Sequence, residues 1–269
     1  MIASSTFVLL GIMGAFGVIL PLCVSIWWIK THKEKISTIL LGALAFFAFA
    51  LVLEGTIHTV VFLLVPSLAK NVIAYTIYGA LMAGLFEETG RYIFFKFVLK
   101  KRTNRETAIS YGIGHGGFEA LYILVMTSIQ YIIYAVMINN GQFQTLIDTV
   151  AASGTDTSQL LLLPDAIASI TVGAIVLGCF ERITAMLFHV AMSIIVFYAV
   201  KKSKIALYFL AILLHALLDT PAALFQMGVI TNQLVLEGII FAIAVVAIIG
   251  AVKLLYNKDT QTKEVTESV

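Results

Sequence analysis

The sequence predicts an all-α fold, a polytopic bundle of seven to eight transmembrane helices that forms one domain over residues 1–256. Hydrophobic residues make up 60% of the 269 residues and charged residues only 12%, whereas about 25% of a typical soluble domain is charged. The apolar runs are long enough to cross a membrane, since one helical span takes about 20 residues. A soluble core of this length could not bury so much apolar surface, so membrane lipid must be a partner of the chain.

The charge balance and the cysteines exclude other classes of protein. The net charge is only +2 and the Lys and Arg residues gather in short loop clusters, so we expect no nucleic-acid partner. Cys23 and Cys179 lie in apolar runs without the spacing of a redox motif, which is typical of buried thiols that act as small apolar residues. The first apolar run lacks an early basic residue, so we interpret it as a retained span and not as a secretory signal.

Six spans follow from the apolar runs in order, at about 5–29, 38–65, 71–99, 107–137, 205–227 and 233–256. Residues 139–163 are predicted to form a polar loop, and residues 257–269 a disordered polar tail. The stretch 165–200 is ambiguous, because 36 helical residues would extend ~54 Å, far more than a ~30 Å hydrocarbon core. It could form one long tilted or kinked helix, a short re-entrant or interfacial helix that ends near Glu181 before a single crossing, or two full crossings.

Basic residues in the loops predict the orientation, because cytoplasmic loops carry an excess of Lys and Arg. The first loop and the third loop must lie on the same side, and both are basic: they hold Lys30, Lys33, Lys35, Lys100, Lys101, Arg102 and Arg105. We therefore expect the N-terminus outside. The cluster Lys201, Lys202 and Lys204 should also be cytoplasmic, which favours seven net crossings over eight.

Ionisable residues inside the predicted spans are the strongest functional signal. Each costs roughly 2.5–3.5 kcal/mol at the bilayer centre on insertion scales, so such residues usually face a bundle interior and often mark function. Several are four residues apart and so share a helix face. The set is Glu54, His58, Glu87, Glu88, Arg91, His115, Glu119, Glu181, Arg182, His189, His215 and Asp219.

Counting residues from the cytoplasmic end of each span gives the depth of these groups at ~1.5 Å per residue. Glu87 and His189 lie ~16 Å deep, His215 ~15 Å and His115 ~12 Å. Four helices thus deliver titratable groups to one layer, nearer the cytoplasmic side. Glu54 lies in the outer half of its span, and with His58 it is more typical of a structural or gating pair.

Such a layer could hold and activate a water molecule. A glutamate can act as general base, and His189, His215 and Glu88 could bind zinc, which needs about three protein ligands and one open position. A histidine and Asp219 could instead orient the water and stabilise an oxyanion without a metal. His115 and Glu119 could orient these groups or contact substrate. The alternatives are a structural ion-pair cluster around Glu87, Glu88 and Arg91 and interhelical hydrogen bonds from the histidines.

Three segments resemble a known superfamily. FEETGRYIFFKF at 86–97 resembles the glutamate-pair motif of the CAAX protease and bacteriocin-processing (Abi) enzymes, LFHVAMS at 187–193 their Phe-His motif, and LLHALLDT at 213–220 their third motif, a His followed four residues later by Asn or Asp. The chain is most similar to the YhfC family of intramembrane metalloproteases, which also carries a segment like HGGFEA at 115–120. The resemblance covers about residues 40–250.

The resemblance implies a role for each matched residue. Glu87 and Glu88 would be the water-activating pair, His189 and His215 their partners, and Asp219 would help to polarise the substrate. Arg91 would be the basic residue of the first motif, although the spacing here is EExxR and the prenyl-protein enzymes have EExxxR.

We therefore expect an intramembrane peptidase of a bacterial cell membrane. It would hydrolyse a peptide bond of a membrane-associated peptide or protein, in or near the bilayer. A non-enzymatic scaffold or immunity-type protein and a proton-coupled transporter are the alternatives.

Overall fold

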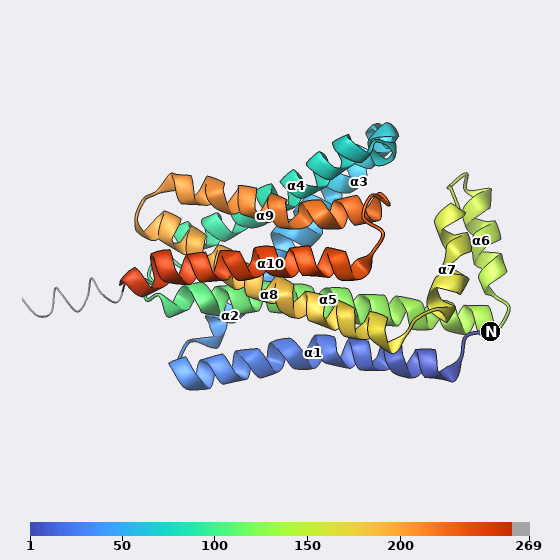
Figure 1. Cartoon of the computed structure of the whole chain (residues 1–269), viewed down its shortest axis with the longest axis horizontal. Coiled ribbons are helices and arrows are strands. Elements are labelled where there is room, and N and C mark those ends of the chain that lie inside the picture. The colour runs from blue at the N-terminus through green and yellow to red at the C-terminus, as the bar shows by residue number, and fades with distance from the viewer. Residues whose placement is uncertain (260–269) are drawn as a thin grey trace, which may run out of the picture. The chain divides into compact units, whose positions relative to one another are not determined.

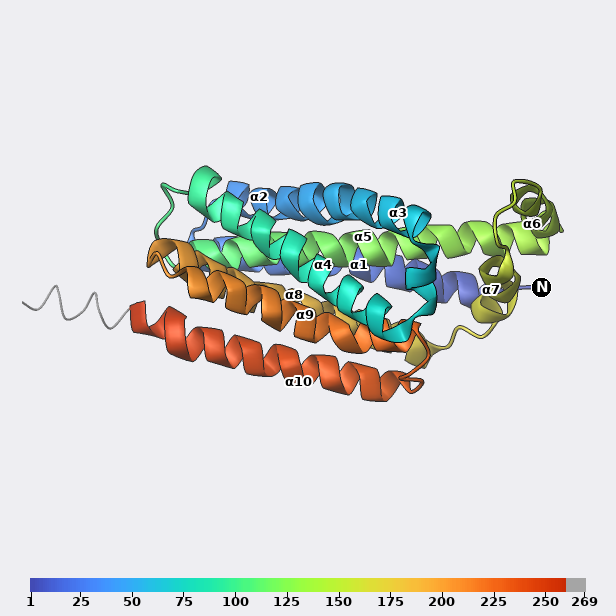
Figure 2. The same cartoon turned by 90° about the horizontal axis from the view of Figure 1, so that it is seen from above.

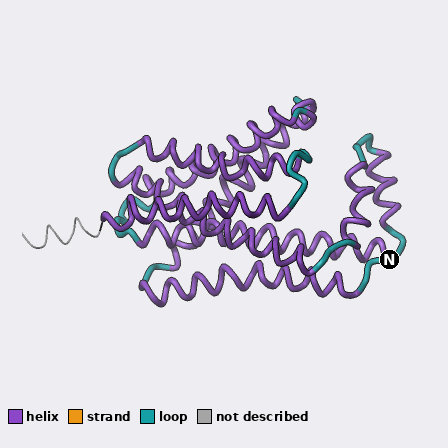
Figure 3. Tube along the Cα trace, viewed as in Figure 1, coloured by secondary structure: helices purple, strands orange, loops and turns teal. Residues whose placement is uncertain are grey.

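The computed structural model describes residues 1–259, and these are helical with short connections (Figures 1 and 3). No strand occurs in the described part, which confirms the predicted all-α class. Six helices are long and apolar enough to cross a membrane. Helix α4 is a seventh helix of 22 residues that carries Glu87, Glu88 and Arg91. With this composition the chain is an integral membrane protein.

The residues divide into two compact units. The first comprises residues 1–20 and 120–180, and the second residues 21–119 and 181–259. The long helices α1 (Ser4–His32), α5 (Glu106–Asn139) and α8 (Val172–Lys201) contribute residues to both units. The other elements belong to one unit each.

In the first unit, the ends of the long helices pack with the short helices α6 (Phe143–Ala152) and α7 (Ser158–Ala168). Its apolar core includes Leu10, Leu124 and Ile175, with a second cluster around Ile167. The backbone of Ile2 and the side-chain amide of Asn139 exchange hydrogen bonds of 2.6 and 3.0 Å. Figure 1 shows α6 and α7 as a hairpin that stands across the end of α5.

The second unit holds most of the bundle. Its further elements are α2 (Ile36–Phe46), the π-helical stretch η1 (Phe47–Glu54), α3 (Gly55–Leu64), the 3₁₀ turn η2 (Pro66–Lys70), α4 (Val72–Ile93), η3 (Phe94–Val98), α9 (Ile205–Gln226), α10 (Gln233–Ala251) and η4 (Val252–Tyr256). Figure 2 shows α8, α9 and α10 side by side. Phe188, Met192 and Val196 of α8 are fully buried, so the second half of α8 forms the centre of this unit.

Local sequence fixes where several of these helices begin. The Asn71 side chain accepts a hydrogen bond of 3.0 Å from Ala74 N at the start of α4, and Asn232 accepts bonds from Leu234 N and Val235 N at the start of α10. These are N-caps, which supply acceptors to the otherwise unpaired first amides of a helix. The turn between α9 and α10 contains Gly228 at φ +72°, a conformation that favours glycine.

Two predicted segments differ from the structure. Residues 139–163, predicted to be a polar loop, contain α6 and the first part of α7. Residues 165–200 form neither one long helix nor two crossings, because α7 ends at Ala168 and α8 begins at Val172. The short helix therefore ends well before Glu181, and the following 30-residue helix makes a single crossing possible.

The predicted tail from residue 257 begins as helix, since the helix that starts at Gln233 continues to Asp259. The rest of the predicted tail, residues 260–269, lies outside the described residues.

Candidate active site

Charged and imidazole side chains from four helices meet inside the second unit. They are Glu87, Glu88 and Arg91 of α4, His115 and Glu119 of α5, Arg182 and His189 of α8, and His215 and Asp219 of α9. The layer that residue counting predicts is thus a set of direct contacts. Every member except Asp219 is at least 85% buried at its side chain.

Two glycines let the backbones of these helices approach closely. A Cβ added to Gly116 of α5 would lie 2.8 Å from Met186 Cα of α8, and one added to Gly84 of α4 would lie 2.7 Å from Ile212 O of α9. Neither position can accept a side chain unless the backbone of the partner helix moves. Both glycines lie within one turn of a site residue, so close packing brings His115 to His189 and Glu88 to His215.

Glu87 lies among three histidines. Its Oε2 atom is 2.8 Å from His115 Nε2, 3.8 Å from His189 Nδ1 and 3.9 Å from His215 Nε2. The rings of His115 and His189 have centroids 4.8 Å apart, and those of His189 and His215 are 5.5 Å apart. One carboxylate therefore faces imidazoles from three different helices.

Glu88, the next residue, is held in a different way. Its Oε2 accepts a hydrogen bond of 2.9 Å from Arg91 Nε, and its Oε1 lies 2.7 Å from His215 Nδ1. Both oxygens have partners, and the side chains of Glu88 and Arg91 are fully buried. A buried charge is tolerated when it is paired and hydrogen-bonded. We call the Glu88–Arg91 pair an ionic support, that is, a buried ion pair that also holds a histidine of the site.

Arg91 also determines which ring nitrogen of His189 carries the proton. One guanidinium NH2 group donates to His189 O at 3.1 Å and to Ser193 Oγ, and the other donates to His189 Nδ1 at 3.1 Å. A guanidinium only donates hydrogen bonds, so His189 Nδ1 must be the acceptor. The ring then carries its proton on Nε2, which pairs with Glu119 Oε2.

Arg182 and Glu119 form a second ionic support. Arg182 donates from one nitrogen to Glu119 Oε1 at 2.7 Å and from another to Glu181. Glu181, near which one of the sequence alternatives ended a short helix, lies with Arg182 inside α8. Arg182 therefore anchors the carboxylate that holds His189.

His215 and Asp219 complete the arrangement on α9. His215 Nδ1 faces Glu88, whereas its Nε2 lies 3.5 Å from Asp219 Oδ2. The side chain of Asp219 is 32% exposed, the most of any residue in the cluster, although its Oδ2 atom is buried and makes no hydrogen bond. Asp219 is thus the acid of the cluster with the most exposed side chain.

Glu87, His115 and His189 could hold a metal ion, because one donor atom from each lies within 4.8 Å of the other two. Ligand atoms around a tetrahedral zinc ion lie about 3.4 Å apart for bonds of about 2.0–2.1 Å, and the separations of Glu87 Oε2 from His115 and His189, 2.8 and 3.8 Å, bracket that value. His115 Nδ1 is buried without a hydrogen bond, so Nε2, which faces Glu87, is the ring nitrogen with a polar partner among the described residues. A metal on His189 would replace either its bond with Arg91 or its pair with Glu119.

This donor set shares only His189 with the set His189, His215 and Glu88 that the sequence suggests. In the structure His215 and Glu88 bind each other, and His115, expected in an orienting role, faces Glu87.

Glu54 and His58 form a separate chain with Tyr78. His58 Nε2 lies 3.0 Å from Glu54 Oε1, and His58 Nδ1 lies 2.9 Å from Tyr78 OH. The Glu54–His58 pair follows from its i,i+4 spacing, but sequence reasoning missed Tyr78 and also Ser193. For Ser193 a signal was present, because it lies four residues after His189 and donates to His189 O at 2.7 Å.

The sequence has clear relatives. Residues 16–240 match the model of the family described as YhfC intramembrane metalloprotease, a range that includes every residue of the cluster. The "Uncharacterized membrane protein YhfC" of Bacillus subtilis (strain 168) is 35% identical over 257 residues, which cover 94% of this chain and 98% of the relative. No solved structure matches the chain.

Proposed function

Because the chain belongs to the YhfC intramembrane metalloprotease family, we propose that it is a metallopeptidase of a bacterial cell membrane that hydrolyses a peptide bond in or near the bilayer. The observation that carries the proposal is the buried donor set of Glu87, His115 and His189, which three different helices supply. The substrate is a membrane-associated peptide or protein, since three of the four helices of the site, α5, α8 and α9, are long and apolar enough to cross a membrane.

Zinc is the metal that we propose for this set. Two imidazoles and one carboxylate, with a fourth position open, are the donors of a known class of catalytic zinc sites. When bound, zinc supplies Lewis acidity to the carbonyl oxygen of a peptide bond. Whichever of Arg91 and Glu119 the metal does not replace would hold the other ring nitrogen of His189, as the partners of ligating histidines commonly do.

Asp219 is the residue to which we assign the proton transfer. As the water oxygen bonds to the carbonyl carbon, one water proton passes to the Asp219 carboxylate. The same proton then goes to the amide nitrogen as the C–N bond breaks, which leaves a carboxylic acid and an amine. His215, fixed by Glu88, places its Nε2 atom 3.5 Å from Asp219 Oδ2.

Metal content and cleavage together test this assignment. Glu87→Gln and His115→Ala should lose bound zinc and cleavage together. Asp219→Asn should keep the zinc and lose cleavage by about 10²–10⁴-fold, the range of general-base contributions. Zinc is measured in the purified protein, and cleavage as new amino termini in membrane proteins added to proteoliposomes.

Glu54→Gln is the matched control, because Glu54 is a buried carboxylate outside the donor set. It should keep both zinc and cleavage. A folded Glu87→Gln/Glu88→Gln double variant with full cleavage activity would refute the peptidase assignment and favour the scaffold alternative. Unchanged zinc content in Glu87→Gln and His115→Ala would refute the metal site.

A further inference from the structure

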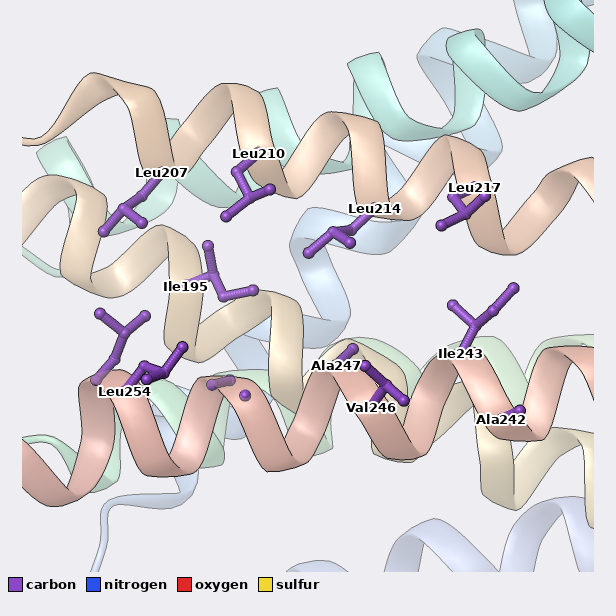
Figure 4. A pocket seen from close by; sticks show the side chains of 13 residues that line it. Ile195, Leu207, Leu210, Leu214, Leu217, Ala242, Ile243, Val246, Ala247 and Leu254 are labelled. Atoms are coloured by element: carbon purple, nitrogen blue, oxygen red, sulfur yellow. The ribbon is translucent and has the colours of Figure 1, made fainter.

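An apolar groove lies between α9 and α10, away from the charged cluster. It has a volume of about 460 Å³, and Leu207, Leu210, Leu214 and Leu217 of α9 form one wall. Figure 4 shows these leucines pointing toward α10, with Ile195 of α8 at the base. The lining contains no charged or polar side chain. A groove of this composition in a membrane protein suits a hydrocarbon occupant.

The groove opens to the surroundings of the bundle. Leu217 is 52% exposed and Val246, on the opposite wall, is 73% exposed. On α10 the hollow is made by small residues, among them Ala242 and Gly250. The groove is therefore accessible from the lipid phase.

The length of the groove distinguishes among hydrocarbon occupants. Leu207 and Leu217 are ten positions apart, which is about 15 Å along a helix, and Ala242 and Leu255 are thirteen positions apart, about 20 Å. A transmembrane helix needs about 30 Å of apolar surface to pack along its full span. One leaflet is about half of the hydrocarbon core, roughly 15 Å. The groove thus matches the acyl chain of a lipid from a single leaflet.

Lysines lie beyond one end of the groove. Lys202 and Lys204 lie in the turn between α8 and α9, seven residues after Ile195 and three residues before Leu207, and Lys258 follows η4, four residues after Leu254. Lys201 Nζ lies 2.6 Å from Asp259 Oδ2, which places the end of α8 beside the residues that follow η4.

From this combination we propose that the groove binds an anionic phospholipid, with an acyl chain along α9 and α10 and its phosphate at Lys202, Lys204 and Lys258. In the orientation that the basic loops predict, this end faces the cytoplasmic leaflet, where basic residues attract anionic lipid. The lipid would brace α8 and α9, which carry His189 and His215. The proposal does not depend on peptidase activity.

Native mass spectrometry of the delipidated protein tests the headgroup. The probes are phosphatidylglycerol and phosphatidylcholine with identical acyl chains. Wild-type protein should retain phosphatidylglycerol at least about fivefold better, since one basic residue contributes about that factor. The triple variant Lys202→Gln/Lys204→Gln/Lys258→Gln should lose the preference. The control Lys30→Gln/Lys33→Gln/Lys35→Gln, which removes three lysines elsewhere, should keep it.

A second pair of variants tests where the acyl chain binds. A Cβ at Gly250 or Gly238 of α10 meets nothing within 4 Å, so both positions accept a larger residue. Gly250 lines the groove and Gly238 does not. Gly250→Leu should reduce retention of both lipids at least about fivefold, whereas Gly238→Leu should not.

Four results would overturn the proposal. The first is that both lysine triple variants lose the preference for phosphatidylglycerol equally. The second is that a folded Gly250→Leu protein retains lipid as well as the wild type. The third is that inorganic phosphate alone raises the thermal unfolding midpoint as much as phosphatidylglycerol does. The fourth is a dimer mass without lipid, which would assign the groove to a second copy of the chain.

Discussion

Glu87 and Glu88 are neighbours in sequence, yet their surroundings give them different roles. Glu87 faces three imidazoles, whereas Glu88 binds Arg91 and His215 with both oxygens. The sequence motif identifies both residues as a pair but does not show which role each residue has. The contacts favour Glu87 as a metal ligand and Glu88 as the group that positions His215.

Substitution of each glutamate by glutamine should separate the two roles. Glu88→Gln leaves the buried Arg91 guanidinium without its carboxylate, and breaking a buried ion pair costs about 3–5 kcal/mol. Glu87→Gln removes no arginine partner and should destabilise the protein much less. The measurement is the thermal unfolding midpoint of both metal-free variants in one detergent. Equal midpoints would contradict the ionic-support role of Glu88.

The common level of the site residues along their helices could be predicted from the sequence, but their pairing could not. Counting along a helix gives position on its axis because the rise per residue is constant. The rotation of each helix about its axis decides whether His115 or His215 faces Glu87, and that depends on packing at positions such as Gly84 and Gly116. The sequence therefore located the layer and left the donor set unresolved.

Close approach of α4 and α9 is the element-level feature on which the site depends. Gly84 and Gly79 both lie in α4, but only Gly84 contacts a neighbouring backbone, that of Ile212. Gly84→Ala should push the helices apart, lower the unfolding midpoint and weaken zinc binding.

Gly79→Ala on the same helix provides the control. An added Cβ there meets nothing within 4 Å, so the substitution should be neutral or stabilise the fold by about 0.4–1 kcal/mol through the unfolded state. A Gly84→Ala protein as stable as Gly79→Ala would show that the backbone contact does not limit the packing.

Most long helices could be predicted from hydropathy, and the short ones could not. Helix α6 has only ten residues and buries only Phe143 and Ile147, four apart, so its apolar face is shorter than a search for spans of about 20 residues detects. The break before α8 also has a local signal that hydropathy ignores, because Thr171 Oγ1 accepts a hydrogen bond of 3.2 Å from Ala174 N. A search for N-caps would have found that boundary.

At the scale of the whole molecule, the orientation in the membrane stays a prediction. With the N-terminus outside, the α6–α7 hairpin faces outward, and the Lys30 and Lys202 loops face the cytoplasm. In a variant without native cysteines, Asp148→Cys should react with an impermeant thiol reagent on intact cells. Lys33→Cys and Lys202→Cys should react only after permeabilisation. The reverse pattern would invert the topology.

The contact network of the site also has an excess of acidic groups. Five carboxylates (Glu87, Glu88, Glu119, Glu181 and Asp219) meet two guanidinium groups (Arg91 and Arg182). So large an uncompensated negative charge is costly in a low-dielectric interior. The metal-free protein should therefore store protons among these side chains, and an arriving divalent cation should displace them.

The bundle would then act as a small cation exchanger within the bilayer, and acidification would oppose metal loading. Zinc titration calorimetry in buffers of different ionisation enthalpy should report release of at least one proton per ion. Zinc uptake without proton release would mean that the carboxylates are already deprotonated in the metal-free protein and that other groups balance their charge.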